Sequence, residues 1–135
     1  MGKVIYSKIN VISQDKGDIF KLLSNDSQDF DKFGEAYFSN IKFNEIKGWK
    51  KHLKMKCILM PVSGDVDVVI FDFKNNEFEK FNLNIKNPYR LIIPPDTIFA
   101  FKGNENKNCI LNISNILHDP KESLTFNLNE FKYNW

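Results

Sequence analysis

Short apolar segments separated by polar turns recur along the chain from Trp49 onward. Cys57–Val62 and Ile98–Phe101 are uninterrupted apolar runs, whereas Phe78–Leu83 alternates between apolar and polar positions with one irregular step. Alternation buries one face of a strand, and a short apolar run is typical of a strand in a packed sheet. No segment longer than about ten residues has a clean helical period. The pattern therefore predicts an all-β chain.

The predicted strands follow one another at short intervals and are closed by turn residues such as Ser63-Gly64. We expect the core strands at Cys57–Val62, Val66–Phe73, Leu91–Ile93, Ile98–Phe101 and Cys109–Leu117. Further strands are expected at Val4–Ser13, Glu35–Phe43, Phe78–Leu83 and Leu124–Phe131, with a loop or one helical turn within Ser24–Lys32. Many short strands with turns between them predict a β-sandwich or barrel, in which closure of the sheet removes exposed edges.

Composition adds limits on function. The 135 residues suit one domain spanning residues 1–135, and thirteen Phe residues favour packed sheets over a helical bundle. The net charge is only +2 and Arg90 is the single arginine, which argues against nucleic acid as a partner. No apolar stretch is long enough for a membrane span or a signal peptide. We therefore expect a cytoplasmic protein without a membrane partner.

Several kinds of catalytic site are excluded by the residues present. Cys57 and Cys109 both lie in apolar runs and are expected to be buried thiols, and no CxxC pair occurs. There is no GxSxG elbow and no glycine-rich phosphate loop. Any enzymatic activity should therefore depend on proton transfer by a histidine, a lysine or a nearby tyrosine or aspartate.

A basic segment follows Trp49 and contains one of the two histidines. If Trp49–Cys57 is extended, one face carries Lys50, His52, Lys54 and Lys56. Neither face is uniformly apolar, which suggests a β-bulge or a strand start nearby. Clustered basic groups suit an anionic ligand, and the alternative is a solvated edge strand protected by lysines.

A metal cofactor is not expected. A metal site of three imidazoles and a carboxylate cannot be built, because the chain has only His52 and His118. The H-x-H pair of such sites is replaced by Lys50-Lys51-His52, and an ammonium group has no lone pair for a metal. We therefore predict no cofactor.

Five segments occur in the order of a known family. They are Asp15-Lys16-Gly17, Ile46–His52, Val62–Asp72, Leu91–Phe101 and Leu117–Glu122. Leu91–Phe101 resembles the family's I-P-P-G-x-x-H-G-F, and Leu117–Glu122 is similar to its Y-Y-x-P-x-x-E. Over most of its length the chain thus resembles the RmlC-like dTDP-4-dehydrorhamnose 3,5-epimerases, whose relatives include the sugar-nucleotide 3,4-ketoisomerases.

The resemblance implies a jelly-roll cupin that is usually a homodimer and acts on nucleotide-linked 4-keto sugars, most often dTDP-sugars, without a metal. His52 matches the second histidine of the ketoisomerase H-x-H, and Lys50 stands at the place of the epimerase base. Lys16 and Lys47 replace phosphate-binding arginines, which retains charge but loses the bidentate fork. The family's tyrosine acid aligns near Asn112, and its histidine-orienting aspartate lies in a C-terminal extension.

Two functions follow. The first is a sugar-nucleotide epimerase or isomerase with His52 and Lys50 as catalytic residues, since neighbouring cations favour the neutral form of a lysine. The second is a non-catalytic relative that binds a sugar or sugar nucleotide, or assists a partner enzyme. In both, the substrate-binding residues are predicted to be Lys16, Lys47, Lys54, Asn112 and His118. We expect Lys50 and His52 on the wall of one cavity and Lys16 and Lys47 at its mouth.

Overall fold

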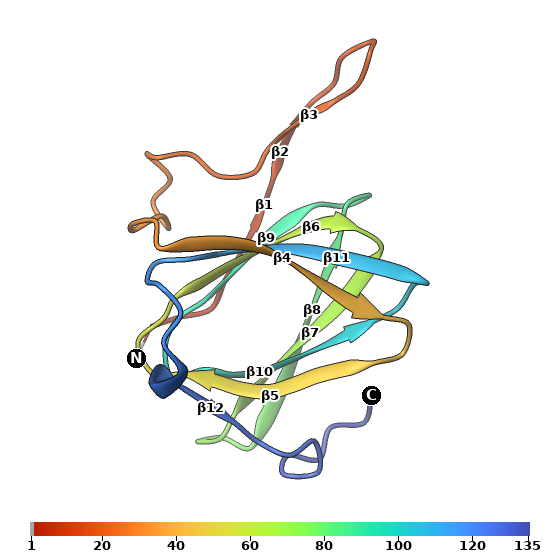
Figure 1. Cartoon of the computed structure of the whole chain (residues 1–135). Helices are drawn as coiled ribbons and strands as arrows, with labels where there is room; N and C mark the ends of the chain where they lie inside the picture. Colours follow the sequence, from red (N-terminus) through yellow and green to blue (C-terminus); the bar gives the residue numbers. More distant parts are fainter. Residues whose placement is uncertain (1) are drawn as a thin grey trace.

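Two antiparallel five-stranded sheets face each other and enclose the core in the computed structural model, which describes residues 2–135 (Figure 1). Sheet I has the strand order β1-β9-β6-β11-β4, and sheet II has the order β12-β5-β10-β7-β8. The strands are β1 Ile5–Lys8, β2 Asn10–Ile12, β3 Ile19–Lys21, β4 Glu35–Lys42, β5 Ile46–His52, β6 Cys57–Ser63, β7 Asp65–Asp72, β8 Glu77–Asn84, β9 Tyr89–Ile93, β10 Ile98–Gly103, β11 Lys107–Ser114 and β12 Ser123–Thr125. The predicted all-β jelly roll is confirmed, and all five predicted core strands are present.

Strand β7, which lies between β10 and β8 in sheet II, is apolar without interruption from Val68 to Phe71. Val66, Val68 and Ile70 point into the core between the sheets. Val69 and Phe71 point the other way and join a second apolar cluster on the outer face of sheet II. A strand that is covered on both faces has no solvent-facing positions, so its sequence loses the polar alternation.

The predicted last strand, Leu124–Phe131, is shorter than expected. Only β12 pairs with β5, and Phe126 then exchanges two backbone hydrogen bonds with Trp49. Beyond this point the backbone leaves the ladder. The apolar residues that suggested a strand here serve instead to cover the sheet.

The segment after β12 is a C-terminal tail, residues 126–135, that packs on the outer face of sheet II. Trp49 is completely buried beneath it, with its ring 5.8 Å from the rings of Phe131 and Trp135. The indole Nε1 donates to the carbonyl of Leu128 at 3.3 Å. Burial of a whole indole with its N–H satisfied makes Trp49 the anchor of this face.

The predicted strand Val4–Ser13 is divided into two. Ile9, between β1 and β2, is buried against Ile58, Met60 and Ile92 on the outer face of sheet I, and its backbone N–H donates to the carbonyl of Pro88. Strands β2 and β3 then form a two-stranded arm that projects from the body (Figure 1). The arm exposes the apolar side chains of Val11, Ile12 and Ile19.

Helix is confined to a single 3₁₀ turn, η1 (Pro120–Glu122), within residues 2–135. The predicted loop within Ser24–Lys32 is a series of turns, fixed to sheet I where Arg90 Nε donates to Asp29 at 3.1 Å. No helix among the described residues has the length and apolar character needed to cross a membrane.

Candidate active site

A cavity of about 310 Å³ opens between the two sheets. It is lined by Tyr37, Ser39, Lys47, Gly48, Trp49, Lys50, His52, Phe99, Phe101, Asn112 and Thr125. The lining comes from β4 and β11 of sheet I and from β5, β10 and β12 of sheet II. The volume lies at the lower end of the range for small-molecule sites. The lining combines aromatic side chains with lysines, a histidine and a tyrosine.

A β-bulge in β5 brings three basic side chains to this cavity. Opposite β10, Phe101 pairs with Lys47 and Phe99 with Lys50, so β5 contains one extra residue at this point. Without the bulge, Lys47 and Lys50 would point to opposite faces, because side chains alternate along a strand. His52 follows Lys50 by two positions and shares its face. The irregularity predicted near Trp49 is confirmed.

Glycine is required at the bulge. Gly48 has φ +143°, which L-residues rarely adopt. A Cβ at Gly48 would lie 2.5 Å from the Cβ of Ala100 and 2.8 Å from its Cα. The close approach of β5 to β10 therefore depends on the missing side chain.

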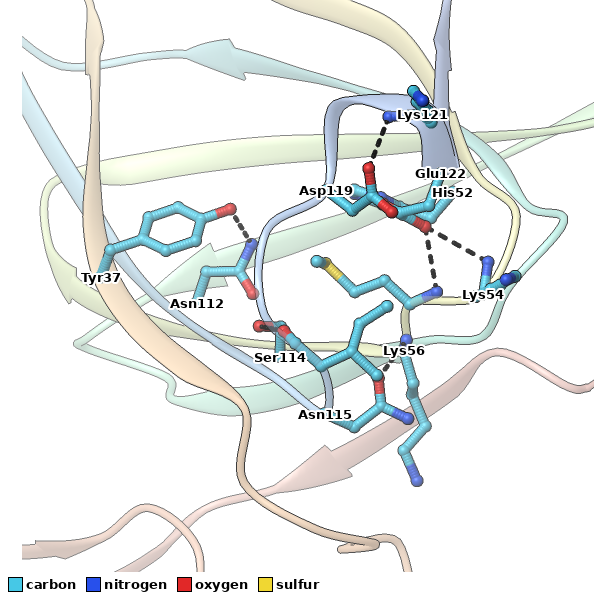
Figure 2. Close-up of polar contacts among 12 residues, drawn as sticks. Tyr37, His52, Lys54, Lys56, Asn112, Ser114, Asn115, Asp119, Lys121 and Glu122 are labelled. Atoms are coloured by element: carbon cyan, nitrogen blue, oxygen red, sulfur yellow. Dashed lines mark hydrogen bonds and ion pairs between the residues drawn. The ribbon is translucent and has the colours of Figure 1, made fainter.

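The side chain of His52 is held by Glu122 from the 3₁₀ turn η1. The Nδ1 atom of His52 contacts Oε1 of Glu122, and both side chains are buried. The other carboxylate oxygen, Oε2, accepts from the backbone N–H groups of Lys54 and Met55, each at 3.2 Å. Figure 2 shows the contacts between this carboxylate and the backbone after β5. Since Nδ1 is engaged, Nε2 is the ring nitrogen available to a ligand.

The surroundings of Glu122 favour its ionised form. Burial alone would raise the pKa of this carboxyl group, but the hydrogen bond and charge of His52 and the two backbone N–H donors lower it below its ordinary value. An ionised Glu122 accepts from an N–H at Nδ1 of His52 and so fixes the orientation of the ring. The pair thus has the arrangement of a general base with an orienting carboxylate.

Glu122 was not recognised as a site residue from the sequence. The family's orienting aspartate was expected in a C-terminal extension, but here a glutamate inside the Leu117–Glu122 motif occupies that role in the geometry. A local signal exists: Asp119 caps η1 by accepting from the N–H of Lys121 at 2.9 Å, and Pro120 begins the turn. This turn presents Glu122 to the end of β5.

Tyr37 is a second cavity residue outside the predicted set. It lies on β4, where its Cα pairs with that of Asn112 on β11. The Nδ2 group of Asn112 donates to the hydroxyl oxygen of Tyr37 at 2.8 Å (Figure 2). Alternation along Glu35–Phe43 places Tyr37 and Ser39 on one face, which could have indicated a polar wall.

Lysines supply the positive charge of the cavity. The Nζ group of Lys47 donates to Oγ of Ser39 at 3.3 Å, which connects the two sheets across the cavity. Lys50 is half-buried in the same lining. Arg90 is occupied by Asp29 and by the carbonyl of Leu22 at 2.6 Å, outside the cavity.

Three predicted binding residues lie elsewhere in the chain. Lys16 lies in the turn at the tip of the arm, and His118 is exposed between β11 and η1. Strand β5 ends at His52, so the expected strip of alternating basic residues does not continue to Lys54 and Lys56. Lys54 is exposed, and Nζ of Lys56 donates to the carbonyl of Asp29 at 3.0 Å. The structure therefore brings Lys47, Lys50, His52 and Asn112 together, but not Lys16, Lys54 or His118.

The two cysteines are free, and burial raises the pKa of the Cys57 thiol to about 12. Cys57 is therefore a protonated, unreactive side chain at ordinary pH. Among residues 2–135, no three His, Cys, Asp or Glu side chains are grouped so that they could hold a metal ion.

The fold and the cavity define a class of protein: a cupin jelly roll that encloses a histidine–carboxylate pair, a tyrosine and lysines. No family model matches the chain, and no curated protein sequence matches it either. Several solved structures, however, are similar to this chain. The dTDP sugar isomerase from Desulfovibrio desulfuricans G20 has a TM-score of 0.90 and 25% sequence identity, covering 98% of this chain and 90% of that chain.

Two further groups of sugar-nucleotide enzymes have the same fold. The sugar 3,4-ketoisomerase QdtA from Thermoanaerobacterium thermosaccharolyticum, solved in complex with TDP, has a TM-score of 0.79 and 17% identity, covering 95% of this chain and 90% of that chain. The 3,5-epimerase RmlC from Legionella pneumophila Philadelphia 1 was solved in complex with dTDP-4-keto-L-rhamnose. It has a TM-score of 0.81 and 12% identity, covering 93% of this chain and 73% of that chain. The RmlC-like cupin fold implied by the sequence resemblance is confirmed.

Proposed function

We propose that this chain is a nucleotide-linked 4-keto-sugar isomerase or epimerase that works by metal-independent proton transfer. The observation that carries the proposal is the buried His52–Glu122 pair in a cavity that also contains Tyr37 and Lys50. An acid–base pair needs a proton acceptor, a group that stabilises the acceptor once protonated, and a proton donor within the same enclosure. His52, Glu122 and Tyr37 supply these three parts.

In the proposed reaction, Nε2 of His52 removes a proton from a carbon next to the ketone. The electrons of the broken C–H bond form the enolate double bond, and the negative charge moves to the ketone oxygen. The ammonium group of Lys50 and the hydroxyl group of Tyr37 stabilise this oxygen. Return of a proton to the opposite face of that carbon gives an epimer. Delivery of the proton to the former carbonyl carbon gives a ketoisomer, when the enolate oxygen gains a proton and the neighbouring hydroxyl group loses one. No redox partner is consumed in either case.

Binding of the nucleotide is assigned to the lysines of the cavity. A diphosphate carries about two negative charges near neutral pH, and lysines hold such a group as point charges. Lys47 connects β5 to β4 through Ser39, which places its charge at the wall between the two sheets. The dTDP and dTDP-sugar ligands of similar structures support a nucleotide-linked sugar as the substrate class.

The test is deuterium exchange into dTDP-4-keto-6-deoxyglucose, followed by NMR at each carbon. His52→Ala should abolish exchange while nucleotide binding stays nearly intact, because the imidazole acts in the transition state. Lys47→Ala should weaken nucleotide binding with a smaller effect on the rate of the bound substrate. His118→Ala is the matched control, since His118 is exposed and outside the cavity.

The same experiment distinguishes the proposed enzyme from a second candidate, a protein that binds a sugar nucleotide without catalysis. Lys50 stands where the resembling epimerases have their base, which favours a non-catalytic protein that binds a sugar nucleotide or assists a partner enzyme. Nucleotide binding without exchange at any carbon would support that function. Turnover that stays within about threefold of wild type in His52→Ala would exclude His52 as the base.

We also propose a cytoplasmic homodimer. An isolated two-stranded hairpin is marginally stable in water, yet the arm exposes Val11, Ile12 and Ile19, and β4 exposes Phe38. A second copy that covers these side chains would remove them from water.

If Lys16 contacts the substrate, as the resemblance implies, it does so in the second copy, because it lies outside the cavity of its own chain. Light scattering at micromolar concentration should give about twice the chain mass of 15.8 kDa, and a value near 15.8 kDa would contradict the dimer.

A further inference from the structure

We propose that Asn112 is a positioning residue that acts on Tyr37 rather than on the substrate, and that it keeps the Tyr37 hydroxyl free to donate into the cavity. The inference rests on the proposed function for its catalytic meaning, but not for its test. It starts from an asymmetry in the amide: Nδ2 donates to Tyr37 Oη at 2.8 Å, whereas Oδ1 is buried and has no hydrogen-bond partner among the described residues.

The direction of the hydrogen bond follows from its donor, because an amide Nδ2 can only donate and the Tyr37 oxygen must accept. A phenol has one proton to donate and lone pairs that accept. When the Tyr37 oxygen accepts from Asn112, its own proton remains available to another acceptor. Tyr37 and Asn112 line the same cavity as His52, so a ketone or enolate oxygen bound there is the acceptor that this geometry serves.

The backbone holds the amide in place. The Cα atoms of Tyr37 and Asn112 are direct partners in the β4–β11 ladder, and on its other side Asn112 pairs with Leu59 of β6. Asn112 is buried, with 6% of its surface exposed, whereas Tyr37 is 43% exposed. The buried side chain of Asn112 therefore orients the more exposed side chain of Tyr37.

The hydrogen bond also sets the acidity of the phenol. Burial raises the pKa of Tyr37, the negative charge of Glu35 raises it further, and the hydrogen bond from Asn112 lowers it. The other titratable groups of the cavity are Lys47, Lys50 and His52. A donor to the oxygen favours the phenolate, so Asn112 makes Tyr37 a stronger acid than its surroundings would otherwise allow.

The test is an NMR titration of tyrosine labelled with ¹³C at Cζ, in the absence of any substrate, with Tyr37→Phe to assign the signal. Asn112→Ala should raise the pKa of Tyr37 by about half a unit to one unit, the value of one lost neutral hydrogen bond. Asn112→Asp has nearly the same shape, but its carboxylate accepts from the phenol and adds negative charge, so the pKa should rise further. The pKa of Tyr37 can still be measured in Asn112→Asp if the alanine variant does not fold.

Nucleotide binding and turnover test the other half of the inference. Asn112→Ala should lower kcat by up to about fivefold, leave nucleotide affinity unchanged, and cause no further loss in a Tyr37→Phe background. A Tyr37 pKa that falls or does not move in Asn112→Ala would overturn the inference, because the amide would then accept from the phenol or not contact it. Weaker nucleotide binding, or losses that add to those of Tyr37→Phe, would overturn it in favour of direct substrate contact. The titration is unaffected if the protein lacks the proposed activity, so the two failures are distinguishable.

Discussion

Glu122 contacts Nδ1 of His52 from seventy residues further along the chain, and its second oxygen is held by the backbone just beyond His52. The carboxylate thus joins the end of β5 to the turn η1. The carbonyl of Glu122 also accepts from the N–H of Leu53 at 2.6 Å. One residue therefore both closes the fold at this point and orients the imidazole.

Replacing Glu122 should separate these two contributions. Glu122→Gln keeps the size but loses the charge that stabilises a protonated His52, so we expect exchange to slow by about a hundredfold or more with nucleotide binding retained. Glu122→Ala should additionally lower the free energy of unfolding by about 1–3 kcal/mol, because buried backbone N–H groups lose their acceptor. Urea denaturation and the deuterium-exchange assay measure the two effects. Wild-type exchange in Glu122→Gln would show that His52 does not need the carboxylate.

The Glu122 carboxyl group should contribute to acid sensitivity. Its pKa is lowered in the folded chain from the ordinary value of 4.5, so the unfolded chain binds the extra proton first as the pH falls. The contribution to stability is therefore fully present above 4.5 and is lost as the pH falls through the folded pKa. Urea midpoints between about pH 6 and pH 3 should fall less steeply for Glu122→Gln than for the wild type. The comparison is needed because the pKa values of Asp26 and Asp72 are lowered as well.

Tyr37→Phe should lower kcat by about 10²- to 10⁴-fold if the hydroxyl is the proton donor. Because the pKa of Tyr37 is raised above its ordinary value of 10.0, the neutral phenol persists through neutral pH and activity should decline only above pH 10. A pH–rate profile of the wild type should contain this alkaline limb. Tyr133→Phe is the matched control, since Tyr133 lies in the C-terminal tail. Equal losses in both variants would mean that Tyr37 has no specific role.

Removal of residues 128–135 should destabilise the whole domain. The deletion uncovers Trp49 and Phe71 and removes the Leu128 carbonyl that accepts from the indole. Exposing a previously buried large apolar side chain costs about 1.5–3 kcal/mol, and the deletion exposes more than one. The melting temperature should fall markedly, and activity should fall with it because Trp49 adjoins Lys50 on β5. An unchanged melting temperature would show that the tail is dispensable.

A smaller change tests the same packing. Phe131→Ala should reproduce part of the loss, because its ring contacts those of Trp49 and Phe71. Leu117→Ala is a suitable control, since Leu117 is 71% exposed. Thermal denaturation of the two variants should therefore give clearly different midpoints.

The sequence by itself determined the strands and the class of fold. Hydrophobic runs and turn residues are local properties, so they located β6, β7, β9 and β10 closely. The same local pattern led to error at Leu124–Phe131, where apolar residues cover a sheet instead of extending it. A side chain that packs on the outside of a sheet and one that packs inside it have the same hydrophobicity, and only the tertiary structure distinguishes them.

Part of the site was also accessible from the sequence. His52 and Lys50 were selected because two positions on one strand share a face, and both line the cavity. Lys54 was placed on the same face only because the strand was expected to continue, whereas β5 ends at His52. The position at which a strand stops depends on its partners, here β10 and β12, and not on its own residues.

Tertiary structure alone decided which groups surround His52. Glu122 lies seventy residues beyond His52, and Tyr37 lies on the preceding strand β4 in the opposite sheet, so neither is a neighbour of His52 along the chain. The bulge that places Lys47 beside Lys50 is fixed by the close packing of Gly48 against Ala100. Local patterns determine which face of a strand is polar, but a cavity is formed where strands distant in sequence meet, and its chemistry depends on their register.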